Sequence, residues 1–77
     1  MFNIPTVDLV ATGKNIEKLR KEVGLSVKEL QNIFGFGTPQ AIYKWESGKN
    51  LPTIDNCIIL ARLLGVNMEE LLVINEW

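Results

Sequence analysis

Glycine residues divide this chain into short segments whose apolar residues recur every three or four positions, which is the spacing of an amphipathic helix. Gly24, Gly48 and Gly65 each end such a segment, and Gly35-Phe36-Gly37 separates two others. Glycine commonly ends a helix because it readily adopts the left-handed backbone conformation of the terminating residue. The spacing of these glycines therefore predicts an all-α fold of five short helices joined by tight turns.

Two of the expected helices begin with the sequence pattern of a capping box. Ser26 is followed three residues later by Glu29, and Asn67 is followed at the same spacing by Glu70. In this arrangement each side chain bonds a backbone N–H that the first turn of a helix leaves free. The pattern predicts a second helix from residue 26 to about residue 34 and a short fifth helix after residue 67.

The third and fourth helices have other start signals. Thr38 followed by Pro39 predicts a capping side chain and then proline at the first helical position, where its missing N–H costs nothing. This third helix is expected to run to Ser47. The segment Leu51-Pro52-Thr53 is expected to start a fourth helix that spans residues 54–64.

The apolar periodicity assigns each helix a buried face. The residues expected in the core are Ile16, Leu19 and Val23 in the first helix, Leu30, Ile33 and Phe34 in the second, Ile42 and Trp45 in the third, and Ile54, Cys57, Ala61 and Leu64 in the fourth. Residues 1–12 are expected to form an N-terminal arm that packs on the body, with Asp8 or Thr12 as the cap of the first helix. Residues 13–72 are expected to form the domain and residues 73–77 a C-terminal tail.

Composition excludes several classes of function. The chain has 77 residues, enough for one core, with one cysteine and no histidine. A disulfide framework and a zinc site are therefore not expected, and the single cysteine fits a cytoplasmic protein. No segment predicts a membrane span or a signal peptide. Nothing combines a nucleophile, a base and an orienting group, so we expect neither an enzyme nor a cofactor, and no small-molecule ligand is evident.

Charge is distributed unevenly along the chain, although the formal net charge is −1. Residues 1–50 carry seven basic and five acidic residues, whereas residues 51–77 carry one basic and four acidic residues. A molecule with one basic end is able to dock on phosphates despite an acidic total, with an affinity that depends on salt.

The segment that begins at Thr38 is apolar on one side only, as a helix docked in the major groove of DNA must be. Gln40 and Lys44 are four residues apart and therefore share the outer face. Glutamine is able to bond adenine through two hydrogen bonds, and lysine donates to guanine. The start of the second helix offers free N–H groups and Lys28 to a phosphate.

From Gly13 to Leu72 the chain resembles the phage-repressor (Cro and XRE) type of helix-turn-helix domain found in small bacterial transcription regulators. The matching segments are GKNIEKLRKEVGLSVKEL, TPQAIYKWESGKNLP and LARLLGVNMEELL. The resemblance implies a five-helix, lambda-repressor-like DNA-binding domain whose third helix reads the major groove. It implies base contacts from Pro39, Gln40 and Lys44, and contacts near backbone phosphates from Thr38, Tyr43 and Lys49.

The same resemblance implies an ion pair between Arg20 and Glu46, and it exposes two departures. The family usually has glutamine at the position of Val27, where the side chain contacts DNA, and alanine at the position of Gln31. The turn also looks one residue longer than in phage repressors, with Gly37 as the extra residue. These departures bear on the angle between the second and third helices.

The fourth helix and the C-terminal residues carry more apolar side chains than one core face needs. We expect part of this surplus to form a homodimer contact through Ile58, Ile59, Leu63, Val73, Ile74 and Trp77. Two-fold pairing would place two reader helices about one DNA turn apart, roughly 34 Å, on a palindromic site.

The sequence therefore predicts a sequence-specific binder of double-stranded DNA that regulates transcription, with repression as the favoured direction. The alternative is a protein-interaction module, antitoxin-like or anti-repressor, that uses the helix-turn-helix as a scaffold. The acidic C-terminal part, Val27 and Gln31 favour that alternative.

Overall fold

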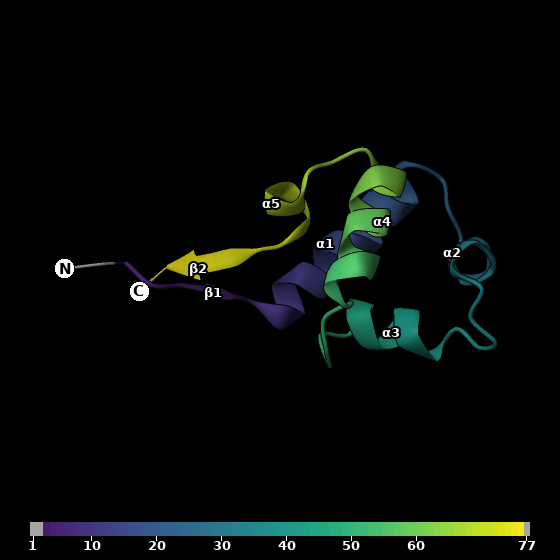
Figure 1. Cartoon of the computed structure of the whole chain (residues 1–77), viewed down its shortest axis with the longest axis horizontal. Coiled ribbons are helices and arrows are strands. Elements are labelled where there is room, and N and C mark those ends of the chain that lie inside the picture. Colours follow the sequence, from purple (N-terminus) through teal and green to yellow (C-terminus); the bar gives the residue numbers. More distant parts are fainter. Residues whose placement is uncertain (1–2, 77) are drawn as a thin grey trace.

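The computed structural model describes residues 3–76 of the chain. In these residues five helices form the body: α1 (Leu9–Glu22), α2 (Val27–Phe34), α3 (Gln40–Glu46), α4 (Ile54–Leu64) and α5 (Met68–Leu71). Two short strands, β1 (Pro5–Val7) and β2 (Ile74–Glu76), pair as an antiparallel ribbon that projects from the helices on the side away from α2 (Figure 1). This mostly helical, five-helix architecture confirms the predicted fold class.

The capping residues explain where α2 and α5 begin. Ser26 Oγ accepts the N–H of Glu29 at 3.0 Å, and the Glu29 carboxylate accepts the N–H of Ser26 at 3.0 Å. Asn67 and Glu70 form the same reciprocal pair at the start of α5. Both predicted capping boxes are confirmed. Gly35, with φ 72°, ends α2 in the left-handed conformation that glycine adopts at little cost.

The start of α3 differs from the expectation. Pro39, rather than Thr38, occupies the N-cap position, and no side chain caps this helix. The first helical hydrogen bond runs from the N–H of Tyr43 to the carbonyl oxygen of Pro39 at 3.1 Å. A residue that precedes proline is disfavoured in the helical conformation, and a bend at residues 37–39 brings the chain into the helix one residue later.

The N-terminal segment also differs from the expected arm of residues 1–12. Helix α1 begins at Leu9, because the carboxylate of Asp8 accepts the N–H of Ala11 at 2.9 Å and caps the first turn. Residues 9–12 are therefore helical. Strand β1 pairs with β2 instead of packing on the body, and Ile4 just before it is 62% exposed. The backbone N–H and C=O groups of the helices already bond within each helix. The C-terminal segment has such groups free to bond the N-terminal segment.

Polar residues on one face of α1 hold the C-terminal segment in place. The hydroxyl of the buried Thr12 accepts the N–H of Val73 at 2.9 Å, and the N–H of Asp8 donates to the carbonyl oxygen of Val73 at 2.8 Å. One turn further along, the amide of Asn15 donates to the carbonyl oxygen of Leu71 at 2.9 Å. These bonds fix the start of β2 beside the start of α1.

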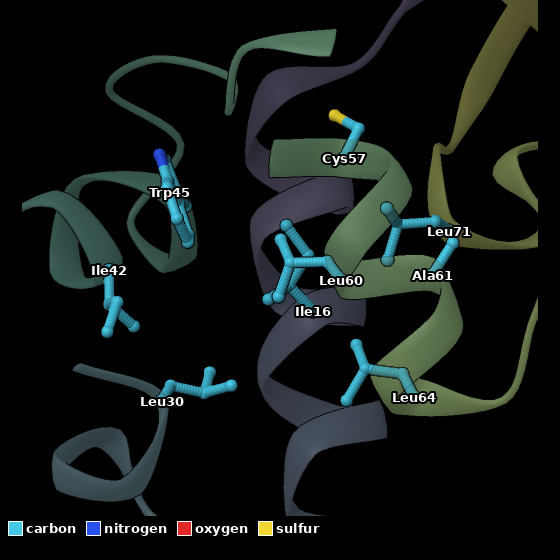
Figure 2. Close-up of a cluster of buried hydrophobic side chains, with 9 residues drawn as sticks. All are labelled: Ile16, Leu30, Ile42, Trp45, Cys57, Leu60, Ala61, Leu64 and Leu71. Atoms are coloured by element: carbon cyan, nitrogen blue, oxygen red, sulfur yellow. The ribbon is translucent and has the colours of Figure 1, made fainter. Parts of the chain in front are cut away.

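The hydrophobic core lies where all five helices meet, and Figure 2 shows its side chains converging between α1, α3 and α4. Its buried members are Ile16, Leu30, Ile42, Trp45, Cys57, Leu60, Ala61, Leu64 and Leu71. Leu60 and Leu71 extend the core beyond the residues predicted from periodicity. Within residues 3–76, no helix combines the length and the apolar character needed to cross a membrane.

Three residues expected in the core are exposed instead. Ile54 is the first residue of α4 and is 73% exposed, because a side chain at that position projects back over the turn before the helix. Val23 lies just past the end of α1 and is 48% exposed. Ile33 is 50% exposed because α2 buries the face that carries Leu30 and Gln31, which turns Ile33 toward solvent.

Candidate nucleic-acid interface

The outward face of α3 carries four polar side chains in one row. Gln40, Tyr43, Lys44 and Ser47 recur at spacings of three and four residues, so they lie along one side of the helix, and all four are exposed. Together with Lys49 they line a hollow of about 450 Å³ at the surface. The structure thus brings four of the residues singled out from the sequence to one site: Gln40, Tyr43, Lys44 and Lys49.

Ser47 is a site residue that the sequence reasoning missed. It is seven residues after Gln40, two helical turns along the same face, and this spacing was the available signal. Its hydroxyl donates to the carbonyl oxygen of Lys44 at 3.3 Å. The hydroxyl oxygen keeps acceptor capacity toward solvent, as serine has two lone pairs.

The remaining predicted contact residues lie outside the lining of the hollow. Thr38 is exposed in the bend before α3, and Pro39 is half-buried at the N-cap of that helix. Lys28 is exposed in the first turn of α2. The chemistry of the combined surface is that of hydrogen-bond donors and acceptors with cationic groups, which suits base edges and phosphates.

The inward face of α3 anchors the helix in the core. Ile42 is fully buried and Trp45 is 5% exposed, as predicted for the inner side. The indole of Trp45 makes edge-on contacts with two rings of the preceding segment, with centroids 5.4 Å from Phe34 and 5.8 Å from Phe36. Lys44, next to Trp45 in the chain, is therefore presented outward from a helix whose other side is fixed.

Helix α3 also packs closely against the backbone of α1. Gly13 is buried in α1, and a β-carbon at this position would lie 2.6 Å from the carbonyl oxygen of Glu46 and closer still to that of Trp45. Such distances are shorter than van der Waals contact, so only glycine permits this approach. The absence of a side chain at residue 13 therefore sets the separation of α1 and α3.

Two turns further along α1, Arg20 holds the end of α3 through its side chain. Its Nε and Nη2 atoms donate to the two carboxylate oxygens of Glu46 at 2.7 and 3.2 Å. Its Nη1 donates to the carbonyl oxygen of Leu25 in the turn before α2 at 2.9 Å. The two charged side chains are only 9% and 8% exposed. Donation of these hydrogen bonds to the Glu46 carboxylate raises the pKa of Arg20, which keeps the guanidinium charged.

The two departures from the family pattern have structural roles away from the outward face. Val27 is half-buried and packs against the core. Gln31 is buried, and its amide donates to the carbonyl oxygen of Phe36 at 3.2 Å across the turn between α2 and α3. In this chain neither residue belongs to the exposed row on α3.

The acidic and cysteine side chains of the described residues do not gather into a metal centre. Residues 3–76 contain no group of three or more His, Cys, Asp or Glu side chains that could hold a metal ion. The thiol of Cys57 is buried in α4 with Sγ 3.6 Å from the carbonyl oxygen of Pro52. Burial raises the pKa of this thiol, which disfavours the reactive thiolate.

Comparison with known families identifies the class to which this arrangement belongs. A model of the helix-turn-helix family matches residues 16–71, which include α2, the turn and α3. The chain therefore belongs to the XRE-type helix-turn-helix family of DNA-binding transcription regulators. A search of the curated proteins found no match.

Solved structures share the fold. The restriction-modification controller protein C.AhdI from Aeromonas hydrophila is similar with a TM-score of 0.71 and 30% sequence identity, over 83% of this chain and 96% of that chain. The DNA-binding domain of BldD gives a TM-score of 0.70 at 22% identity, over 86% and 94% of the two chains. Apo-HppE gives a TM-score of 0.73 at 22% identity, over 88% of this chain and 37% of that chain. At this identity the likeness to apo-HppE is one of fold alone.

Proposed function

We propose that this protein is a cytoplasmic transcriptional repressor that inserts α3 into the major groove of double-stranded DNA. The single observation that carries the proposal is the two-sided character of α3, which is buried along Ile42 and Trp45 and exposed along Gln40 and Lys44. A helix anchored in this way presents donors and acceptors at fixed positions, which direct reading of base edges requires.

Phosphate contacts would flank the base-reading residues. Tyr43 and Lys49 line the same hollow as Gln40 and Lys44, so a strand lying along the hollow meets a hydroxyl and an ammonium group. Thr38 and Pro39 precede α3, where Thr38 offers a hydroxyl to a phosphate and Pro39 an apolar contact to a base. Lys28 and the free N–H groups at the start of α2 supply a phosphate contact on the first helix of the motif.

Homodimerisation would use the exposed apolar residues of α4. Ile58 and Ile59 are 43% and 41% exposed, whereas Leu63 is half-buried against the core and has less surface to offer. In the C-terminal segment Val73 is half-buried and Ile74 is 41% exposed. Trp77, the remaining residue expected at this contact, lies outside the described residues. A two-fold dimer would bind a palindromic site and repress by occupying a promoter.

Binding of duplex DNA by the purified protein tests the proposal. The wild type should bind random-sequence duplex in dilute salt, and its affinity should fall steeply as salt is added. Bound duplexes selected from a random pool should then show a preferred, palindromic sequence. A protein that ignores duplex DNA at low salt, or selects no sequence from the pool, would contradict the proposal and favour an interaction module.

Two substitutions locate the reading face. Gln40→Ala and Lys44→Ala should each weaken binding to the selected duplex by about 1–3 kcal/mol and relax preference at one base pair. Lys18→Ala is the matched control, because Lys18 is an exposed lysine on α1 that faces Glu22 at 3.9 Å and lies outside the hollow. A loss in Lys18→Ala equal to that in Lys44→Ala would show a general effect of charge rather than reading by Lys44, and an unchanged affinity in the uncharged substitution Gln40→Ala would remove Gln40 from the reading face.

A further inference from the structure

The turn between α2 and α3 contains a buried polar side chain that the exposed site does not use. Gln31 is 8% exposed and is one of three buried polar or charged residues in the described part of the chain. We propose that Gln31 is a positioning residue that braces this turn and so determines how α3 is presented to DNA. The proposal rests on the proposed function, because it assigns to Gln31 an effect on the same binding surface.

Gln31 and Phe36 are joined by two hydrogen bonds across the turn. The side-chain amide of Gln31 donates to the carbonyl oxygen of Phe36 at 3.2 Å. In return, the N–H of Phe36 donates to the backbone carbonyl oxygen of Gln31 at 3.0 Å. Between them Gly35 adopts the left-handed conformation. The pair of bonds closes the turn and fixes the direction in which the chain leaves α2.

Phe36 transmits this direction to α3. Its ring stacks on Phe34 with centroids 5.2 Å apart, and it meets the indole of Trp45 edge-on at 5.8 Å. Trp45 is the buried anchor of α3, and Lys44 beside it faces outward. A shift of the turn that moves Phe36 therefore also moves the surface on which α3 rests, and with it the row of exposed side chains.

Positioning and stability have different consequences for DNA binding. Bonds to base edges require correct distances and angles, whereas attraction to phosphates acts over a longer range and tolerates a small rotation of the helix. A misplaced α3 therefore loses preference for one sequence while it keeps its general attraction to DNA. Partial unfolding, in contrast, lowers the active concentration equally for every duplex.

The test compares Gln31→Met with Asn32→Leu. The first variant removes the buried amide at nearly constant side-chain volume, and the second removes an exposed amide from the next residue of α2. The probes are the tightest duplex selected by the wild type from a random pool and a scrambled duplex of the same composition. Gln31→Met should bind the selected duplex about tenfold more weakly and the scrambled duplex within about twofold of the wild type. Asn32→Leu should leave both affinities unchanged.

The test is read from the ratio of the affinity for the selected duplex to the affinity for the scrambled duplex. Partial unfolding of a variant lowers both affinities equally and leaves this ratio unchanged. Gln31→Glu provides a second variant, since it keeps the shape but places a carboxylate against the carbonyl oxygen of Phe36, and it should lower the ratio as well. A wild-type ratio in both variants, or an equal loss on both duplexes, would overturn the positioning role. A wild type that selects no sequence would instead overturn the proposed function, and this result is seen before any variant is measured.

Discussion

Gly13 and Trp45 meet backbone to backbone: a β-carbon on Gly13 would overlap the carbonyl oxygen of Trp45, so α1 and α3 are as close as two helices without an intervening side chain allow. The contact is made by the main-chain carbonyl groups of Trp45 and Glu46, the last two residues of α3. The approach of this end of α3 to α1 therefore depends on the absence of one methyl group.

Gly13→Ala should destabilise the protein, although alanine favours a helix over glycine by about 1 kcal/mol. We expect the overlap with the carbonyl oxygens of Trp45 and Glu46 to exceed that gain and to give a net loss of about 1–3 kcal/mol in the free energy of unfolding. Gly37→Ala is the control, because its added methyl group meets nothing within 4 Å. Urea denaturation of both variants measures the difference, and equal stabilities would show that α1 and α3 separate easily.

The Arg20–Glu46 pair should show strong coupling in a double-mutant cycle. Removing either side chain leaves a buried charge without its partner, so Arg20→Ala and Glu46→Ala should each cost roughly 3–5 kcal/mol of unfolding free energy. The double variant should cost much less than the sum of the two. Glu17 and Lys21 form an exposed pair at 3.7 Å that serves as the control, where coupling should be about 0–1 kcal/mol. Additive effects at Arg20 and Glu46 would refute the coupling.

Thr12 should matter for its hydroxyl group rather than for its volume. Thr12→Val keeps the shape but leaves the N–H of Val73 without its acceptor, which should cost about 1–3 kcal/mol. Thr12→Ser keeps the oxygen and should retain the hydrogen bond. Amide hydrogen exchange at Val73 reports the bond directly: exchange should accelerate in the valine variant and stay slow in the serine variant. Slow exchange in both would mean that the hydroxyl of Thr12 does not protect this amide.

Acid should loosen the start of α1 through Asp8. Hydrogen bonds from the N–H of Ala11, and then from the amide of Asn75, lower the pKa of this carboxyl below its usual range. A carboxyl whose pKa is lower in the folded protein stabilises the fold above the unfolded pKa of about 3.9, and this contribution is lost as the pH falls through the folded pKa. The Tm of the wild type should exceed that of Asp8→Asn at pH 7, and the gap should narrow as the pH falls below the unfolded pKa of about 3.9. A gap that stays constant across this range would contradict the assignment.

Lys49 should contribute to DNA binding through its positive charge and not by reading the base sequence. Lys49→Ala should weaken binding to selected and scrambled duplexes alike and reduce the slope of log affinity against log salt by about one. The control is Lys18→Ala, which removes the same charge from α1 outside the hollow. An effect of Lys49→Ala on one sequence only would assign this lysine to base reading.

The helices could be predicted because their boundaries are encoded locally. Ser26 with Glu29 fixes the start of α2 within four residues of sequence, and Gly35 fixes its end. The spacing of Gln40 and Lys44 likewise predicts the exposed face of α3, since residues four apart on a helix share a side.

The ribbon and the exact burial pattern could not be predicted in the same way. Strands β1 and β2 have three residues each and pair across almost the whole chain, so neither carries a local signal for its partner. Thr12 is one of two residues that the sequence offers as the cap of α1, but its hydroxyl accepts a hydrogen bond from the N–H of Val73, 61 residues away. Ile54 fits the apolar periodicity of α4, yet its place at the first helical position turns it to solvent.

The pairing of Pro5 with Glu76 places the beginning and the end of the described chain beside each other. A tight turn that joined these two strands would convert the ribbon into an ordinary hairpin, and the backbone could then be opened at an exposed turn elsewhere. Such a circular permutant should retain the arrangement of α2 and α3, because the new joint lies at the ribbon. Such a permutant would show that the exposed surface of α2 and α3 does not depend on the order in which the helices occur along the chain.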